Sequence, residues 1–193
     1  ATVNFNVGKH NSTTGASIDN ITYGENATVN IIVTGLNGTD LSGKVTITLN
    51  GQIEVNTTVN SDGVGSVVVS GLNAGNYTAE IKYLGNDNYF ESNATVNFNV
   101  GKHNSTTGAS IDNITYGENA TVNIIVSGIN GTDLSGNVTV IVDGVSWNGT
   151  VNSEGVGSVV VPSLNAGNYT AEIKYMGNDN YNGSEMLVNF TVT

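Results

Sequence analysis

Hydrophobic and polar residues alternate with a period of two along much of the chain. Apolar residues occupy every other position in the stretches 29–33, 45–49, 77–83 and 96–100. A period of two sends successive side chains to opposite faces of a strand, so one face is buried and the other is wet, as in antiparallel sheets. The pattern predicts an all-β protein in which the following residues and their later copies point inward: Val29, Ile31, Val45, Ile47, Ile81, Tyr83 and Phe98.

The sequence also contains a long internal repeat. Residues 9–43 recur as 102–136 with two substitutions, and residues 72–83 recur unchanged as 164–175. A period this long corresponds to a whole domain rather than to a solenoid unit. With about seven strands per repeat, this predicts two tandem immunoglobulin-like Greek-key β-sandwich domains, at 8–100 and 101–193.

Residues 1–7 repeat the sequence of residues 94–100. We therefore interpret 1–7 as the last strand of a preceding repeat. Because both domains already own such a strand, we expect this segment to lie along an open sheet edge, either of the first domain or of a neighbouring molecule.

Turn signals separate the predicted strands. Asn50-Gly51 and Asp143-Gly144 are two-residue hairpin signals, because these residues tolerate the positive φ of a type I′ turn. A second local signal resembles a tyrosine corner, in which a tyrosine hydroxyl bonds to nearby backbone; the alternative is an ordinary core aromatic. The residues of the predicted corners are Leu72, Gly75, Tyr77, Leu164, Gly167 and Tyr169.

Several motifs run through both repeats. In the first repeat they are Tyr23-Gly24, Gly43, Leu72-x-Ala74-Gly75-x-Tyr77, Tyr83-x-Gly85-x-Asp87-x-Tyr89 and Ser92. This set resembles the bacterial Ig-like repeat of the group 3 type. Its Asn- and Thr-rich spelling is similar to repeats in adhesin-like cell-surface proteins of methanogenic archaea.

The resemblance implies an extracellular protein of the cell surface. Its repeats would act as a stalk or spacer that displays an adhesive region, and the resemblance brings no catalytic or cofactor-binding residues. The alternative is a module that itself binds glycans or proteins of a host or partner cell. Fold alone does not decide between the two.

Charge narrows the choice of partners. The chain carries 5 Lys and Arg residues against 16 Asp and Glu, for a net charge of −11. Nucleic acid binding needs a basic footprint, and an anionic membrane surface repels an acidic one. No apolar run is long enough to insert into a membrane. The absence of Cys excludes a disulfide framework and thiolate metal sites.

No constellation of catalytic residues is visible in the sequence, so we expect no enzymatic activity and no cofactor. The two imidazoles, His10 and His103, occupy the same repeat position, and carboxylates are scattered singly. The loops 85–88 and 177–180 each contain one Asp, whereas calcium usually takes more than one carboxylate.

Two further chemical possibilities come from single residues. Lys9 and Lys102 stand at the domain starts, and Asn97 and Asn189 in the last strands, an arrangement that could support an isopeptide cross-link. The alternation places Asn97 on the wet face, whereas that reaction needs a desolvated amine. Trp147 either packs at the edge of the second sandwich or forms an exposed aromatic anchor.

Sequons for N-glycosylation are the most frequent chemical signal. The chain has 16 Asn-x-Ser/Thr motifs where chance would give roughly six, which suits a secreted glycoprotein. The alternative is that Asn and Thr recur at this spacing only because both residues suit the solvent-exposed face of a strand. The motifs begin at Asn11, Asn20, Asn26, Asn37, Asn56, Asn76, Asn93, Asn104, Asn113, Asn119, Asn130, Asn137, Asn148, Asn168, Asn182 and Asn189.

Overall fold

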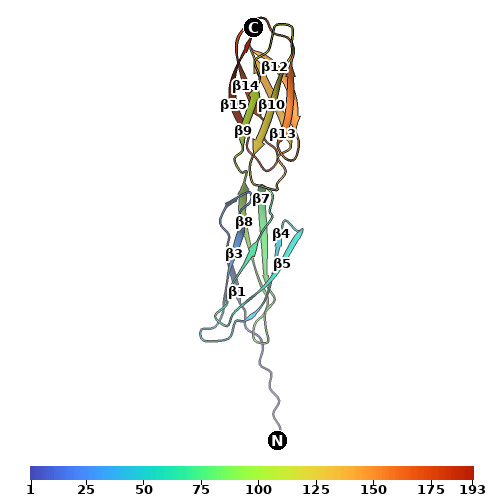
Figure 1. Ribbon diagram of the computed structural model, residues 1–193. Helices are drawn as coiled ribbons and strands as arrows, with labels where there is room; N and C mark the ends of the chain where they lie inside the picture. The colour runs from blue at the N-terminus through green and yellow to red at the C-terminus, as the bar shows by residue number, and fades with distance from the viewer. The chain divides into compact units, whose positions relative to one another are not determined.

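The computed structural model describes all residues from 1 to 193. Its regular structure consists of β-strands, and it divides into two compact units, 1–101 and 102–193, which are called the first and second repeat below. The chain contains no helix that is long and apolar enough to span a membrane. Figure 1 shows the strands of both units.

The first repeat is a sandwich of two sheets. Its strands are β1 (Thr13–Ser17), β2 (Ile21–Thr22), β3 (Ala27–Thr34), β4 (Gly43–Leu49), β5 (Ile53–Val59), β6 (Val64–Val69), β7 (Gly75–Tyr83) and β8 (Ser92–Gly101). One sheet has the order β1-β3-β6 and the other the order β2-β8-β7-β4-β5. The pairings are antiparallel except between β2 and β8, where Ile21 runs parallel beside Val100.

The second repeat has the same strand arrangement, except that a single parallel bridge of Ile114 with Val192 stands in place of the short strand β2. Its strands are β9 (Thr106–Ile111), β10 (Ala120–Ser127), β11 (Gly136–Val142), β12 (Val145–Val151), β13 (Val156–Val161), β14 (Gly167–Tyr175) and β15 (Ser184–Val192). Here one pairing, of Val151 with Gly157, connects β12 to β13. The two sheets therefore join into one of seven strands, in the order β15-β14-β11-β12-β13-β10-β9. The all-β, two-domain sandwich fold predicted from the sequence is confirmed.

The core of each repeat consists of the inward residues that the alternation predicts. In β3, buried and exposed residues alternate without a break from Ala27 to Thr34. The inward residues predicted in the first repeat are all buried, with Phe98 the most accessible at 4%. Burial of each such side chain contributes about 1.5–3 kcal/mol, which lets the fold form without disulfides. Tyr83 donates its core hydroxyl to the Leu41 carbonyl at 3.0 Å, and burial raises the pKa of that hydroxyl.

The two hairpins predicted at the Asn-Gly and Asp-Gly signals differ in length. Asn50 and Asp143 both have positive φ, at 48° and 47°, as the turn chemistry requires. In the second repeat Val142 pairs with Val145, so the loop has two residues. In the first repeat Leu49 pairs with Ile53, because one additional residue lies in the loop. The prediction of a two-residue loop is therefore wrong for the first hairpin.

Residues 1–7 form no strand. Val3, Phe5 and Val7 are each more than 80% exposed, and the segment is drawn in Figure 1 as a coil that joins no sheet. The expectation that it pairs with an open edge of the first repeat is therefore wrong. The place of the last strand itself is occupied by the matching sequence, residues 94–100, which pairs with β7 as part of β8.

Candidate functional site

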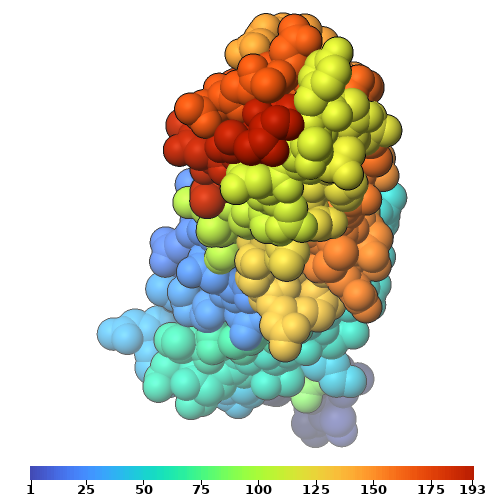
Figure 2. Space-filling model, turned by 45° about the horizontal axis from the view of Figure 1, so that its top comes forward, coloured from blue at the N-terminus to red at the C-terminus, as the bar shows by residue number.

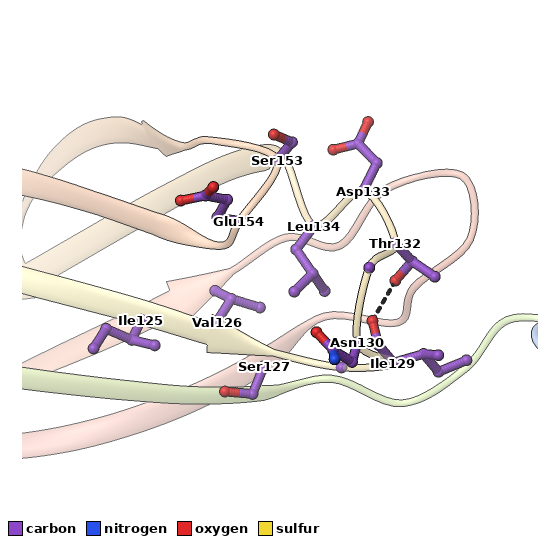
Figure 3. A pocket seen from close by; sticks show the side chains of 12 residues that line it. Ile125, Val126, Ser127, Ile129, Asn130, Thr132, Asp133, Leu134, Ser153 and Glu154 are labelled. Atoms are coloured by element: carbon purple, nitrogen blue, oxygen red, sulfur yellow. Dashed lines mark hydrogen bonds between the residues drawn. The ribbon is translucent and has the colours of Figure 1, made fainter.

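Each repeat has a hollow at the end of one strand, β3 in the first repeat and β10 in the second. In the second repeat the hollow measures about 760 Å³ and lies between residues 125–134 and the turn residues Ser153 and Glu154 (Figure 3). The equivalent hollow of the first repeat, lined by residues 32–41, Ser61 and Asp62, measures about 650 Å³. Figure 2 shows the surface of loop 128–134 in yellow, next to the orange segment that follows residue 150. The same loop therefore forms the same hollow twice.

A buried tyrosine organises this loop. The backbone N–H of Ile129 donates to the Tyr181 hydroxyl at 2.9 Å, and the Thr132 hydroxyl, which also contacts Tyr181, donates to the Ile129 carbonyl at 2.7 Å. Tyr89 makes the same contacts in the first repeat. The sequence analysis did not assign this role to either tyrosine. The recurrence of Tyr89 within its motif could have pointed to it.

The lining of the hollow in the second repeat carries a small negative charge. The backbone N–H of Ser135 donates to Asp133 at 2.8 Å and lowers the pKa of that carboxyl, with the Ser135 hydroxyl as a smaller contribution. Glu154 is the only other charged residue lining this hollow. The hollow thus offers hydroxyl, amide and backbone groups for hydrogen bonding, with neither a base nor a nucleophile held toward a common point.

In each loop considered for calcium binding, the side chain of one asparagine makes hydrogen bonds to the backbone and holds the loop in place. Asn86 accepts the backbone N–H groups of Asn88 and Tyr89 with its Oδ1, at 2.8 and 2.9 Å. Its Nδ2 donates to the carbonyls of Asp40 and Ser42. Because this amide already joins two loops, its oxygen serves the turn rather than a cation, and Asn178 makes the same contacts in the second repeat.

The lysines and asparagines of the isopeptide hypothesis are not brought together. Lys9 donates to the Asn86 carbonyl at 2.6 Å, and Lys102 donates to the Asn178 carbonyl at the same distance. Asn97 is exposed and accepts the Thr78 hydroxyl at 2.9 Å. The two lysines are exposed, and their amines bond to backbone carbonyls instead of the side-chain amides of Asn97 and Asn189, so the geometry gives no support to a cross-link.

The remaining single-residue candidates pack against neighbours. The His10 ring stands edge-on to Tyr89, with centroids 6.2 Å apart, and His103 does the same against Tyr181. Trp147 is half-buried on the inward side of β12, opposite Val140. These positions are those of packing residues.

The two tyrosines of the predicted corners make one backbone hydrogen bond each. Tyr77 donates its hydroxyl to the Asn73 carbonyl at 3.0 Å, and Tyr169 donates to the Asn165 carbonyl at 2.9 Å. Each ring also stacks on the phenylalanine opposite, Phe98 or Phe190. A structural role for the hydroxyls stays a prediction, to be tested by the substitutions described below.

All asparagines of the 16 sequons lie at exposed positions. Nine precede strands or lie in loops and turns, and seven lie within strands. Their exposure makes the amide nitrogens accessible to modification.

The sequence matches the model of the bacterial Ig-like domain, group 3, over residues 2–101 and 106–193. The chain therefore belongs to this family, with two tandem members. No curated protein shows significant similarity to it.

Solved structures with the same fold include invasin, described as a bacterial integrin-binding protein. The match has a TM-score of 0.58 and 20% identity, and it covers 93% of this chain and 39% of invasin. A segment of two fibronectin type III domains from chicken tenascin matches with a TM-score of 0.53 and 15% identity, covering 92% of this chain and 97% of that segment. Identities this low show the fold alone. The chain spans about two fifths of the length of invasin.

Proposed function

We propose that the chain is a stalk segment of an extracellular, adhesin-like cell-surface protein, and that its repeats hold an adhesive region away from the cell. The observation that carries this proposal is duplication. The two repeats bury corresponding positions and form the same loop hollow, so this hollow distinguishes neither repeat as the site of a specialised ligand. The Asn- and Thr-rich spelling supports an archaeal, methanogen source, and the sequons support a glycoprotein.

Physical properties of the repeats agree with a spacer. Each has its own core and needs neither a disulfide nor a bound group to close it. The net charge of −11 keeps such chains soluble and mutually repelling. Membership of the Ig-like family, which has no shared catalytic residues, favours a non-enzymatic role.

One observation favours the second candidate, direct binding of a cell-surface glycan or protein. The outward row Leu187–Glu172–Ile141 of the second repeat replaces Thr95–Glu80–Thr48 of the first. Leu187 is 63% exposed. Apolar residues thus stand at two wet positions of one repeat only, as expected of a contact surface.

Replacement of the two repeats within the whole surface protein separates these functions. If they are spacers, exchange of residues 8–193 for two unrelated sandwich domains of equal length preserves adhesion of the cells, whereas deletion weakens it. Loss of adhesion on exchange, together with the same loss in a Leu187→Thr/Ile141→Thr variant, would show instead that the second repeat binds the partner.

A further inference from the structure

The sequons that begin within strands are confined to one of the two layers of each sandwich. They begin at Asn56 in β5, Asn76 in β7, Asn93 in β8, Asn137 in β11, Asn148 in β12, Asn168 in β14 and Asn189 in β15. All seven asparagines are exposed, so they lie on the outward side. We call this surface, the outward side of strands β4, β5, β7 and β8 and of β11, β12, β14 and β15, the sequon face.

No sequon begins within a strand of the opposite outward surface, that of strands β1, β3 and β6 and of β9, β10 and β13. Four sequons, at Asn11, Asn26, Asn104 and Asn119, begin in the loops before these strands. The strand asparagines of this surface are Asn30 and Asn123, each followed two residues later by isoleucine instead of threonine. Ile32 stands at this position although it is 55% exposed. If Asn-x-Thr were only the usual sequence of an exposed strand face, Thr would be expected two residues after Asn30 and Asn123 as well. The uneven distribution therefore argues against that reading.

The side chains of the sequon face are already oriented. The Oδ1 of Asn148 accepts the Thr139 hydroxyl at 2.9 Å, and the Oδ1 of Asn189 accepts the Thr170 hydroxyl at 2.8 Å. Asn168 is held in the same way by Thr191 at 3.0 Å. Because the oxygen is fixed against the neighbouring strand, the Nδ2 branch of each amide is the one that remains for modification.

We propose that the sequon face of both repeats carries N-linked glycans. The donor is an activated glycosyl phosphate, such as a lipid-linked sugar, and a separate transferase supplies the catalysis. The Asn Nδ2 forms a bond to C1 of the sugar while the bond from C1 to the phosphate oxygen breaks. The phosphate leaves with that electron pair, and the amide nitrogen loses one proton. This inference rests on the extracellular location in the proposed function.

The open edge strands give such glycans a physical role. In the first repeat β5 ends its sheet, and its only charged residue is Glu54. Proteins commonly protect such edges with lysine or proline, of which β5 has neither. A sugar on Asn56 would stand on this edge strand, and one on Asn93 would stand on β8 across the same sheet. Bulky groups at both places hinder pairing with a strand of another molecule.

Glycopeptide mapping of the protein isolated from the cells that produce it tests the proposal directly. We expect occupied asparagines on the sequon face, with Asn148 and Asn189 among them, and an intact mass above that of the polypeptide. An intact mass equal to the bare polypeptide, or sugars on the loop sequons alone, would overturn the proposal.

The first repeat supplies a matched control. Asn97 has the place of Asn189 and accepts a threonine hydroxyl in the same way, but Asn99 follows where Thr191 completes the sequon. Expressed in cells that occupy Asn189, Asn99→Thr should add one glycan at Asn97, Asn189→Gln should remove one, and Asn97→Gln should change nothing. Absence of any gain in Asn99→Thr would contradict the claim that this face accepts sugars.

The edge-protecting role has its own measurement. Enzymatic removal of the glycans from the folded protein should increase the fraction of associated molecules severalfold, measured by light scattering at fixed concentration. An unchanged solution mass would refute that role. These outcomes are independent of the stalk function, because repeats without sugar could still space an adhesive region, and cell adhesion is a different readout.

Discussion

The hairpin β4–β5 of the first repeat and the hairpin β11–β12 of the second occupy equivalent places but fill the core with different residues. In the first, Ile47 stands opposite Val55; in the second, Val140 stands opposite Trp147. The second repeat therefore has a smaller residue in the centre of the sheet and a larger one on the neighbouring strand. Cores tolerate exchanges that conserve total volume. The difference indicates that the side of the sandwich near β5 and β12 can be repacked without changing the fold.

The strands β3, β6 and β7 show the opposite behaviour. Their inward residues recur without change in β10, β13 and β14. In this part of the sandwich, turns and backbone approach each other closely. Gly63 is one example, since a Cβ there would lie 2.0 Å from the Val33 carbonyl oxygen. The contrast predicts that substitutions on the invariant side cost more than substitutions near the variable hairpin.

The largest effect is expected at the turn before β6 and its copy. Gly63 and Gly155 have φ of 78° and 79°. A Cβ at Gly155 would lie 2.1 Å from the Val126 carbonyl oxygen, much as one at Gly63 would clash with Val33. Gly63→Ala or Gly155→Ala should each lower the free energy of unfolding of its own repeat by about 3 kcal/mol, because strain and a backbone clash add. Urea denaturation measures this value.

Gly51 provides the control for that experiment. It also has positive φ, at 69°, but a Cβ there would meet no atom within 4 Å. Gly51→Ala should cost only about 1 kcal/mol, from the left-handed backbone alone. Equal losses at Gly51 and Gly63 would show that the close approach to Val33 has no energetic weight.

The next effect concerns the exchanged pair in the variable hairpin. Trp147→Val should destabilise the second repeat by about 2 kcal/mol, since it leaves space opposite Val140. Addition of Val140→Ile, which restores the pair of the first repeat, should recover about 1 kcal/mol. Strictly additive effects in this double-mutant cycle would show that the two positions do not compensate each other.

A smaller effect is expected for the tyrosine corners. Tyr77→Phe and Tyr169→Phe should each destabilise their repeat by about 1 kcal/mol, through loss of one hydrogen bond to backbone. The ring stacking on Phe98 or Phe190 is retained in both variants. Thermal midpoints that stay unchanged in both would rule out a corner role for the hydroxyls.

Acid stability tests the loop that both repeats share. The backbone N–H of Ser42 lowers the pKa of Asp40, and that of Ser135 lowers the pKa of Asp133. A carboxyl with a lowered pKa stabilises the fold above its unfolded value and loses this contribution as pH falls through its folded value. Relative to an Asp40→Asn/Asp133→Asn variant, the wild type should therefore lose stability below about pH 4. Parallel unfolding curves of the two proteins across this range would contradict the assignment.

The sequence predicted the parts of the molecule that depend on local period. Val29 and Ile31 could be placed in the core because a strand alternates its faces whatever the surrounding topology. The length of the first hairpin could not be predicted, because Asn50-Gly51 specifies backbone angles but not the register of Ile53. The hydrogen-bond partner of Lys9 could not be predicted either, because the Asn86 carbonyl comes next to Lys9 only when two distant loops meet.

The candidate surfaces also divide into features that a local pattern predicts and features that depend on long-range pairing. Exposure of asparagines on a wet strand is a consequence of alternation and could be anticipated for Asn76. Their confinement to one layer of each sandwich depends on which strands pair, so only the structure revealed it. The contacts of Tyr89 likewise join residues about fifty positions apart, and no local pattern encodes such a distance.

The smallest effect is expected for the segment that repeats β8 without taking its place. Deletion of residues 1–7 should leave the thermal midpoint of the first repeat unchanged, because Val3 and Phe5 bury almost no surface against it. The matching residues Val96 and Phe98 of β8 already pair with Ala79 and Tyr77 of β7. Calorimetry and solution mass of the full-length and shortened chains test this expectation. A fall in midpoint at unchanged monomer mass would show that the segment does pack on the first repeat. A mass that drops from dimer to monomer would show instead that residues 1–7 add as a strand to a second molecule.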